Sequence, residues 1–128
     1  MALKISLDFD GTVTDHVEFF AALTSSMQAA GHLVGLLTLR QMPEREFVQN
    51  WLAKKKFPAF DFEIYYIPAA YPDHIAWKKA TIEQCKIDYH FDDMGYDLES
   101  GLAASLRLPN VFHVQCSPPS KKPQPKQD

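Results

Sequence analysis

Apolar and polar positions alternate along this chain with two different periods, and the switching predicts strands separated by helices. Residues 3–9 are apolar at every second position, which is the period of a strand. Residues 15–30 carry apolar side chains at helical spacing, with Asp15 as a candidate N-cap and Gly31 as the stop. The same two patterns predict further strands at 32–38, 62–67, 89–91 and 111–114, and further helices at 43–56, 73–85 and 98–106.

Strands that are separated by helices in this order are typical of parallel βαβ units. The nearly continuous apolar run at 32–38 suits a strand that is covered on both faces. We therefore predict a three-layer, Rossmann-like α/β fold with a central parallel sheet. In such sheets, functional residues gather at the carboxyl ends of the strands.

Length and composition fit one globular domain, because the chain has 128 residues, of which 46% are hydrophobic and 23% charged. We expect this domain to span 1–116, followed by a disordered tail at 117–128 that is rich in proline and lysine and has no large apolar side chain. No apolar run is long enough for a membrane helix, and no signal peptide is evident, so we expect a cytoplasmic protein. The body outside the tail is mildly acidic, which disfavours broad binding to nucleic-acid phosphates.

Polar side chains interrupt the apolar pattern where the predicted strands end. They are Asp8 and Asp10 after the first strand, Thr38 at the end of the second, and Asp92 and Asp93 after the strand at 89–91. Carboxylates that converge at one sheet edge repel each other, so a positive charge has to offset them. A hard divalent cation with oxygen ligands, such as Mg²⁺, is the usual solution.

These strand ends resemble the four motifs of the haloacid dehalogenase-like (HAD) hydrolases. The segment Asp8-Phe9-Asp10-Gly11-Thr12-Val13-Thr14 resembles the first motif, D-x-D-G-T-x-T. The apolar strand that ends at Thr38 resembles the second motif, and Lys78 or Lys79 resembles the lysine of the third. The acidic pair Asp92 and Asp93 resembles the fourth motif. The resemblance implies a HAD fold over residues 1–116.

The resemblance also implies an activity, which is Mg²⁺-dependent hydrolysis of a phosphomonoester through an aspartyl-phosphate. Asp8 would be the nucleophile, and Asp10 would be the general acid and then the general base. Thr38 would bind phosphoryl oxygens, the motif lysine would stabilise the developing charge, and Thr12 would close the turn and help to hold Asp10. The metal ligands would be Asp8, Asp92 and the backbone carbonyl of Asp10, and Asp93 would bind the metal directly or through water, with Asp97 in support.

Two assignments stay open at this stage. Lys78 and Lys79 are neighbours on a predicted helix, so only one can reach the site, and the similarity of Lys79-Ala80 to the family's Lys-Ala helix start favours Lys79. Thr38-Leu39-Arg40 resembles the T-x-R of some nucleotidase-like and polynucleotide phosphatase members. Arg40 would then contact a second phosphate or a base-side oxygen of the substrate. The alternative interpretation is that Arg40 is a solvated side chain without a functional role.

The spacing between the motifs leaves no room for a sizeable cap domain, so we expect an open site. The resemblance then implies a large substrate, such as a polynucleotide end, or a lid from a neighbouring subunit in a homo-oligomer. The loop at 68–72, with Tyr71 at its tip, is the candidate for a small local lid. The competing hypothesis is a binding module that holds phosphate or metal without catalysis.

Overall fold

A parallel five-stranded sheet organises the chain in the computed structural model, which describes residues 2–70, 72–93 and 110–114. The strand order is β3-β2-β1-β4-β5, and every neighbouring pair is parallel. The strands are β1 (Lys4–Leu7), β2 (Leu33–Thr38), β3 (Phe62–Tyr65), β4 (Tyr89–Asp92) and β5 (Val111–His113). The helices are α1 (Val17–Ala29), α2 (Arg45–Lys54) and α3 (His74–Gln84), and a single 3₁₀ turn at Met42–Glu44 leads into α2.

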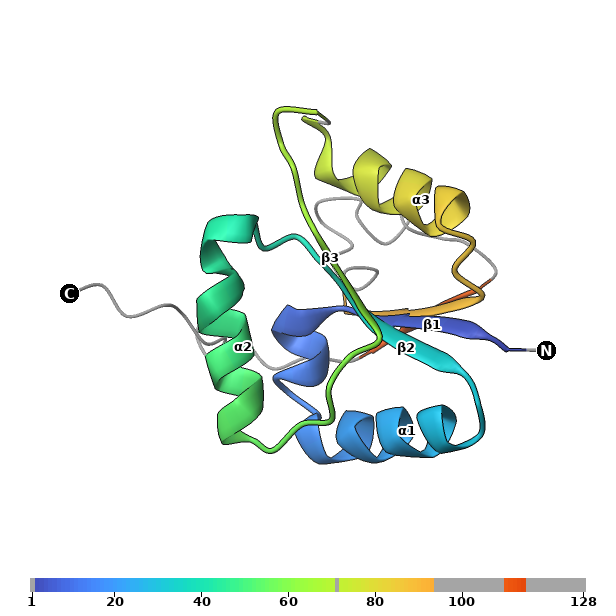
Figure 1. The fold of residues 1–128 in the computed structure, drawn as a ribbon. Helices are drawn as coiled ribbons and strands as arrows, with labels where there is room; N and C mark the ends of the chain where they lie inside the picture. Colours follow the sequence, from blue (N-terminus) through green and yellow to red (C-terminus); the bar gives the residue numbers. More distant parts are fainter. Residues whose placement is uncertain (1, 71, 94–109, 115–128) are drawn as a thin grey trace.

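Two hydrophobic cores hold the helices against the sheet, one on each face. The first joins α1 and α2, through Phe20 and Leu52, to strand residues such as Leu7 and Leu36. The second joins α3, through Trp77 and Ile82, to Leu37 of β2, Tyr66 and Ile87. Figure 1 shows the resulting layers, with α1 on one side of the strands and α3 on the other.

The chain turns sharply after β1. Backbone hydrogen bonds from Val13 N to the Asp8 carbonyl (3.3 Å) and from Thr14 N to the Phe9 carbonyl (3.1 Å) close a wide turn over Phe9–Val13. Gly11 lies inside it with a φ of 80°, a conformation that glycine adopts without steric cost. The turn brings Asp8 and the residues after it to the carboxyl edge of the sheet.

The predicted order of strands and helices is confirmed within the described residues, with ends that shift by a few positions. This part of the structure is an α/β fold, consistent with a Rossmann-like architecture. Gly31 does end the α1 segment, with a φ of 91°, and Asp73 caps α3 by accepting from the amides of Ile75 and Ala76. The expected helix at 98–106, the tail at 117–128 and Tyr71 lie outside the described residues.

No helix in the described part of the chain is long and apolar enough to cross a membrane.

Candidate functional site

The candidate site lies where the order of the strands reverses. From β1 the chain passes outward to β2 and β3, and then crosses over to β4 on the other side of β1. Ligands bind at the carboxyl end of such a switch point in open α/β sheets. Asp8 follows β1 and Asp92 ends β4, and the amide of Asp8 donates to the carbonyl of Phe91 at 3.0 Å.

Three carboxylates meet at this switch point. Asp8, Asp92 and Asp93 each offer an oxygen, and these oxygens all lie within 4.8 Å of one another. Oxygen-only donors of this kind suit a hard divalent cation better than a soft one. The described residues therefore contain a group that could hold such an ion. This group consists of three of the four residues that were predicted as metal ligands.

Lys78 supplies the positive charge inside this cluster. Its Nζ lies 3.0 Å from Asp8 Oδ1 and 2.5 Å from Asp92 Oδ2, and its side chain is 0% exposed. Ile75 and Ile82 are buried on the same side of α3, whereas Lys79 is only partly buried. The preference for Lys79 was therefore wrong: Lys78 is the lysine that faces the carboxylates.

The charges in the cluster change each other's protonation. Burial, followed by the negative charge of Asp92, raises the pKa of Asp8 well above its ordinary value, although Lys78 opposes this. Burial alone would also raise the pKa of Asp92, but the ammonium of Lys78 and the hydrogen bond from His90 outweigh it and lower that pKa. The pKa of Lys78 is raised by both carboxylates in spite of its burial. Asp92 is thus a carboxylate and Lys78 an ammonium, and the negative charge on Asp8 is the one that the site tolerates least.

A buried histidine extends the cluster below the carboxylates. His90 Nε2 lies 2.7 Å from Asp92 Oδ2, and Nδ1 lies 2.7 Å from the Ser6 hydroxyl. Burial lowers the pKa of His90 even though the hydrogen bond to Asp92 acts to raise it, so the ring is neutral at pH 7. Since an ionised carboxylate can only accept, Nε2 carries the proton, and Nδ1 accepts from Ser6. His90 therefore adds a hydrogen bond to Asp92 without adding a second positive charge.

The two predicted threonines are buried at the carboxyl edge of the sheet. The Thr12 hydroxyl donates to Asp8 Oδ2 at 3.4 Å. The prediction that Thr12 helps to hold Asp10 is therefore wrong, because its hydroxyl holds Asp8. The Thr38 hydroxyl accepts from the backbone amide of Arg40 at 3.0 Å. Thr38 thus orders the backbone of the loop that follows β2.

The Asp10 carboxylate does not join the three clustered acids; it is paired with Arg40. Arg40 Nε and Nη2 each lie 2.8 Å from one oxygen of Asp10, and Nη1 lies 3.0 Å from Glu44 Oε2. The guanidinium also packs against the rings of Phe9 and Phe47. Arg40 is only 7% exposed, so the alternative reading of it as a solvated side chain is wrong.

Three partnerships in the site were not predicted from the sequence, and two of them left a signal there. His90 and Asp92 are two residues apart on a strand, so they share a face of the sheet. Trp77, next to Lys78, shifts the apolar side of α3 toward Lys78 and away from Lys79. The pair between Arg40 and Asp10 left no such signal, because it depends on how two loops meet.

Fold and site together define a class: an α/β protein whose parallel sheet carries a buried cluster of acids and one lysine at its switch point. The chain matches no protein-family model, no curated protein and no solved structure.

Proposed function

We propose that this chain is a Mg²⁺-dependent phosphomonoester hydrolase that works through an aspartyl-phosphate on Asp8. One observation carries the proposal: the buried Asp8 carboxylate contacts Lys78 and has two further carboxylate groups, Asp92 and Asp93, close by. The resemblance of the strand-end motifs to those of the HAD hydrolases points to the same activity. A nucleotide or a polynucleotide end is the substrate that we favour.

The donor set fits the metal that this activity needs. Asp8, Asp92 and Asp93 would hold it, with the backbone carbonyl of Asp10 as a further candidate ligand. The raised pKa of Asp8 indicates that Lys78 alone does not compensate the acidic charge. When bound, the metal would neutralise phosphoryl oxygens and align the phosphorus for attack.

Asp8 and its neighbours would carry out the first step. A carboxylate oxygen of Asp8 attacks phosphorus, and the bond from phosphorus to the leaving oxygen breaks. Lys78 and Thr12 contact different oxygens of Asp8 and so fix the plane of its carboxyl group. Lys78 also lies where it can stabilise the negative charge of the transferring group. A water molecule then attacks the phosphorus of the aspartyl-phosphate and regenerates Asp8.

Asp10 would handle the protons of both steps, first giving one to the leaving oxygen and then taking one from the attacking water. In this structure both of its oxygens are held by Arg40. Asp10 therefore has to part from Arg40 before it can act. A phosphorylated substrate offers Arg40 another anion to bind, which gives Arg40 a role in admitting substrate.

The same Arg40–Asp10 pair is the observation that favours the competing hypothesis, a binding module without catalysis. If the pair never opens, the acid cluster still binds a cation and an anionic group but turns nothing over. The two hypotheses agree on metal binding and differ on turnover.

The test is phosphate release in the presence of Mg²⁺ from p-nitrophenyl phosphate, nucleotides, 3′- and 5′-phosphorylated oligonucleotides, sugar phosphates and phosphopeptides. The proposal expects release from at least one substrate, and loss of at least about a thousandfold in Asp8→Asn. Activity that is unchanged in Asp8→Asn would overturn it. A wild-type protein that binds Mg²⁺ but is inert across the panel would instead support the binding module.

A further inference from the structure

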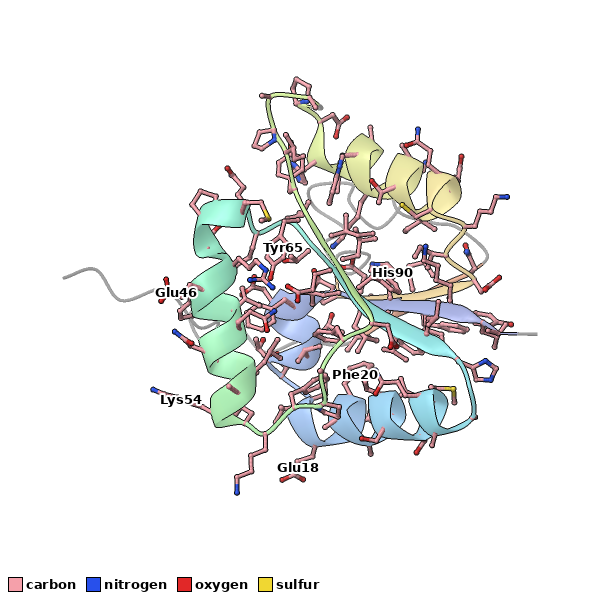
Figure 2. The ribbon with its side chains drawn as sticks, in the orientation of Figure 1. Glu18, Phe20, Glu46, Lys54, Tyr65 and His90 are labelled. Atoms are coloured by element: carbon pink, nitrogen blue, oxygen red, sulfur yellow. The ribbon has the colours of Figure 1, made fainter. Side chains whose placement is uncertain are left out.

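A polar layer lies directly beneath the carboxylates of the site. Ser6 and His90 are partners in the register of β1 and β4. Asp92 comes two positions after His90 on β4, and Asp8 comes two positions after Ser6, directly after β1 in extended backbone. Because side chains alternate along a strand, each of these pairs faces the same side of the sheet. Figure 2 labels His90 in the interior of the protein, next to the strands.

The hydrogen bonds of this layer connect Ser6 to His90 and His90 to Asp92. The Ser6 hydroxyl and His90 Nδ1 are 2.7 Å apart, and His90 Nε2 and Asp92 Oδ2 are also 2.7 Å apart. Lys78 Nζ contacts the same oxygen, Oδ2. Two donors on one oxygen fix the rotation of the carboxyl group, and with it the direction in which Oδ1 points.

We propose that His90, itself held by Ser6, is a positioning residue that sets the orientation of Asp92 for the divalent cation. The inference rests on the proposed function in so far as the cation site is the same. It goes further, because it makes a histidine that touches neither substrate nor metal responsible for the affinity of the site.

The surroundings of His90 argue against a mere filler of the core. The helix α3 side of the sheet also holds Leu37, Trp77 and Ile82, which form an apolar core. An apolar residue at position 90 would pack there without the cost of burying polar atoms. Instead, Ser6, His90 and Asp92 are all 0% exposed and joined to one another. Such outer partners of a metal ligand typically tune metal affinity about 10- to 100-fold.

The test is calorimetric titration of the full chain with Mg²⁺ alone, for the wild type, His90→Leu and His90→Gln. Leucine removes both hydrogen bonds at similar bulk, whereas glutamine keeps a side-chain N–H donor. We expect His90→Leu to bind Mg²⁺ about tenfold or more weakly, and His90→Gln to recover part of that loss. Ser6→Ala should weaken binding in the same direction by a smaller factor.

Thr24→Val is the matched control. Thr24 is also fully buried, but on helix α1, and its hydroxyl has no hydrogen-bond partner within the described part of the chain. We expect this variant to bind Mg²⁺ as the wild type does. Melting temperatures of all variants separate loss of metal affinity from loss of fold.

Two results would overturn the inference: a folded His90→Leu with wild-type affinity for Mg²⁺, or a His90→Gln that is no better than His90→Leu. If His90→Leu does not fold, wild-type affinity in both His90→Gln and Ser6→Ala would overturn it, and weakening in Ser6→Ala would support it. A wild type that binds Mg²⁺ but hydrolyses no phosphomonoester defeats the proposed function and leaves this inference standing. A wild type that binds no Mg²⁺ defeats both.

Discussion

The two faces of the sheet are built from the same strands and differ in what they bury. On the side of α1 and α2, Ile5 and Leu7 of β1 meet Val34 and Leu36 of β2 in a continuous apolar core. On the side of α3, the alternate positions of β1 and β4 carry a hydroxyl, an imidazole and two carboxylates. An apolar face gains from burial at every contact, whereas a charged face costs free energy unless every group is paired.

The comparison indicates a division of labour across the sheet. Each face has an apolar core, but the α3 face also buries a charged cluster, whose burial costs free energy unless its groups are paired. That cost is a common property of catalytic sites, where charges are placed for the reaction and not for folding.

Lys78→Met should have the largest effect. It removes the one ammonium that contacts both Asp8 and Asp92 among the described residues, and unpaired buried carboxylates cost about 3–5 kcal/mol. Urea unfolding measures this loss, and phosphate release should fall with it. Lys79→Met is the control, since Lys79 is only partly buried, and it should stay within about 0.5 kcal/mol of the wild type. Equal losses in the two variants would contradict the assignment of Lys78.

Phe20→Ala tests the apolar face. Phe20 lies on α1, is 1% exposed and packs in the core between that helix and the sheet, where Figure 2 labels it, so truncation should cost about 3–5 kcal/mol. The fold should still bind Mg²⁺ with wild-type affinity at a temperature where the variant is folded. A specific loss of Mg²⁺ affinity, measured by calorimetry, would show that the two faces are not separable.

Much of this architecture follows from the sequence, because the signals for it are local. Alternating apolar residues gave β1, and Gly31 and Asp73 marked helix ends that the structure has. The convergence of Asp8 with Asp92 followed from parallel strands, whose carboxyl ends share an edge. The pairing of Arg40 with Asp10 did not follow, because it depends on the path of two loops and on the reach of a long side chain. The choice between Lys78 and Lys79 depended on the rotation of a single helix.

Arg40→Met tests a polar group that packs against two aromatic rings on the α1/α2 side of the sheet. It removes the bidentate pair with Asp10 but keeps bulk between Phe9 and Phe47. Because Asp10 is 26% exposed and can be solvated, we expect a loss of only about 1 kcal/mol in urea unfolding. If Arg40 admits the substrate, KM should rise more than kcat falls. A variant with higher kcat and unchanged KM would show that Arg40 only restrains Asp10.

Asp8→Asn should change stability in the opposite direction. The raised pKa of Asp8 means that folding disfavours its charged form, so a neutral amide of the same shape should stabilise the metal-free protein at pH 7. Thermal unfolding without Mg²⁺ measures the gain. A destabilised Asp8→Asn would indicate that Lys78 more than compensates the charge on Asp8.

Of these variants, His90→Gln should change the free energy of unfolding least, and the change should depend on pH. The folded state lowers the pKa of His90, so the unfolded chain binds more protons near its ordinary value of 6.5. The wild type should therefore lose stability as the pH falls through that value, and His90→Gln should show a shallower decline. Urea unfolding at a series of pH values from about 7.5 to 5 gives the two slopes. Identical slopes would mean that folding does not change the proton uptake of His90, which would contradict the lowered pKa.

The most direct test of the central claim is mass spectrometry of the peptide that contains Asp8, after acid quench of a reaction with p-nitrophenyl phosphate and Mg²⁺. Asp10→Asn should trap the intermediate, because this leaving group needs no general acid while the attacking water still needs a base. We expect one phosphoryl group on Asp8 in Asp10→Asn, and none in Asp8→Asn. Turnover by the wild type with no phosphorylated Asp8 in either the wild type or Asp10→Asn would contradict it.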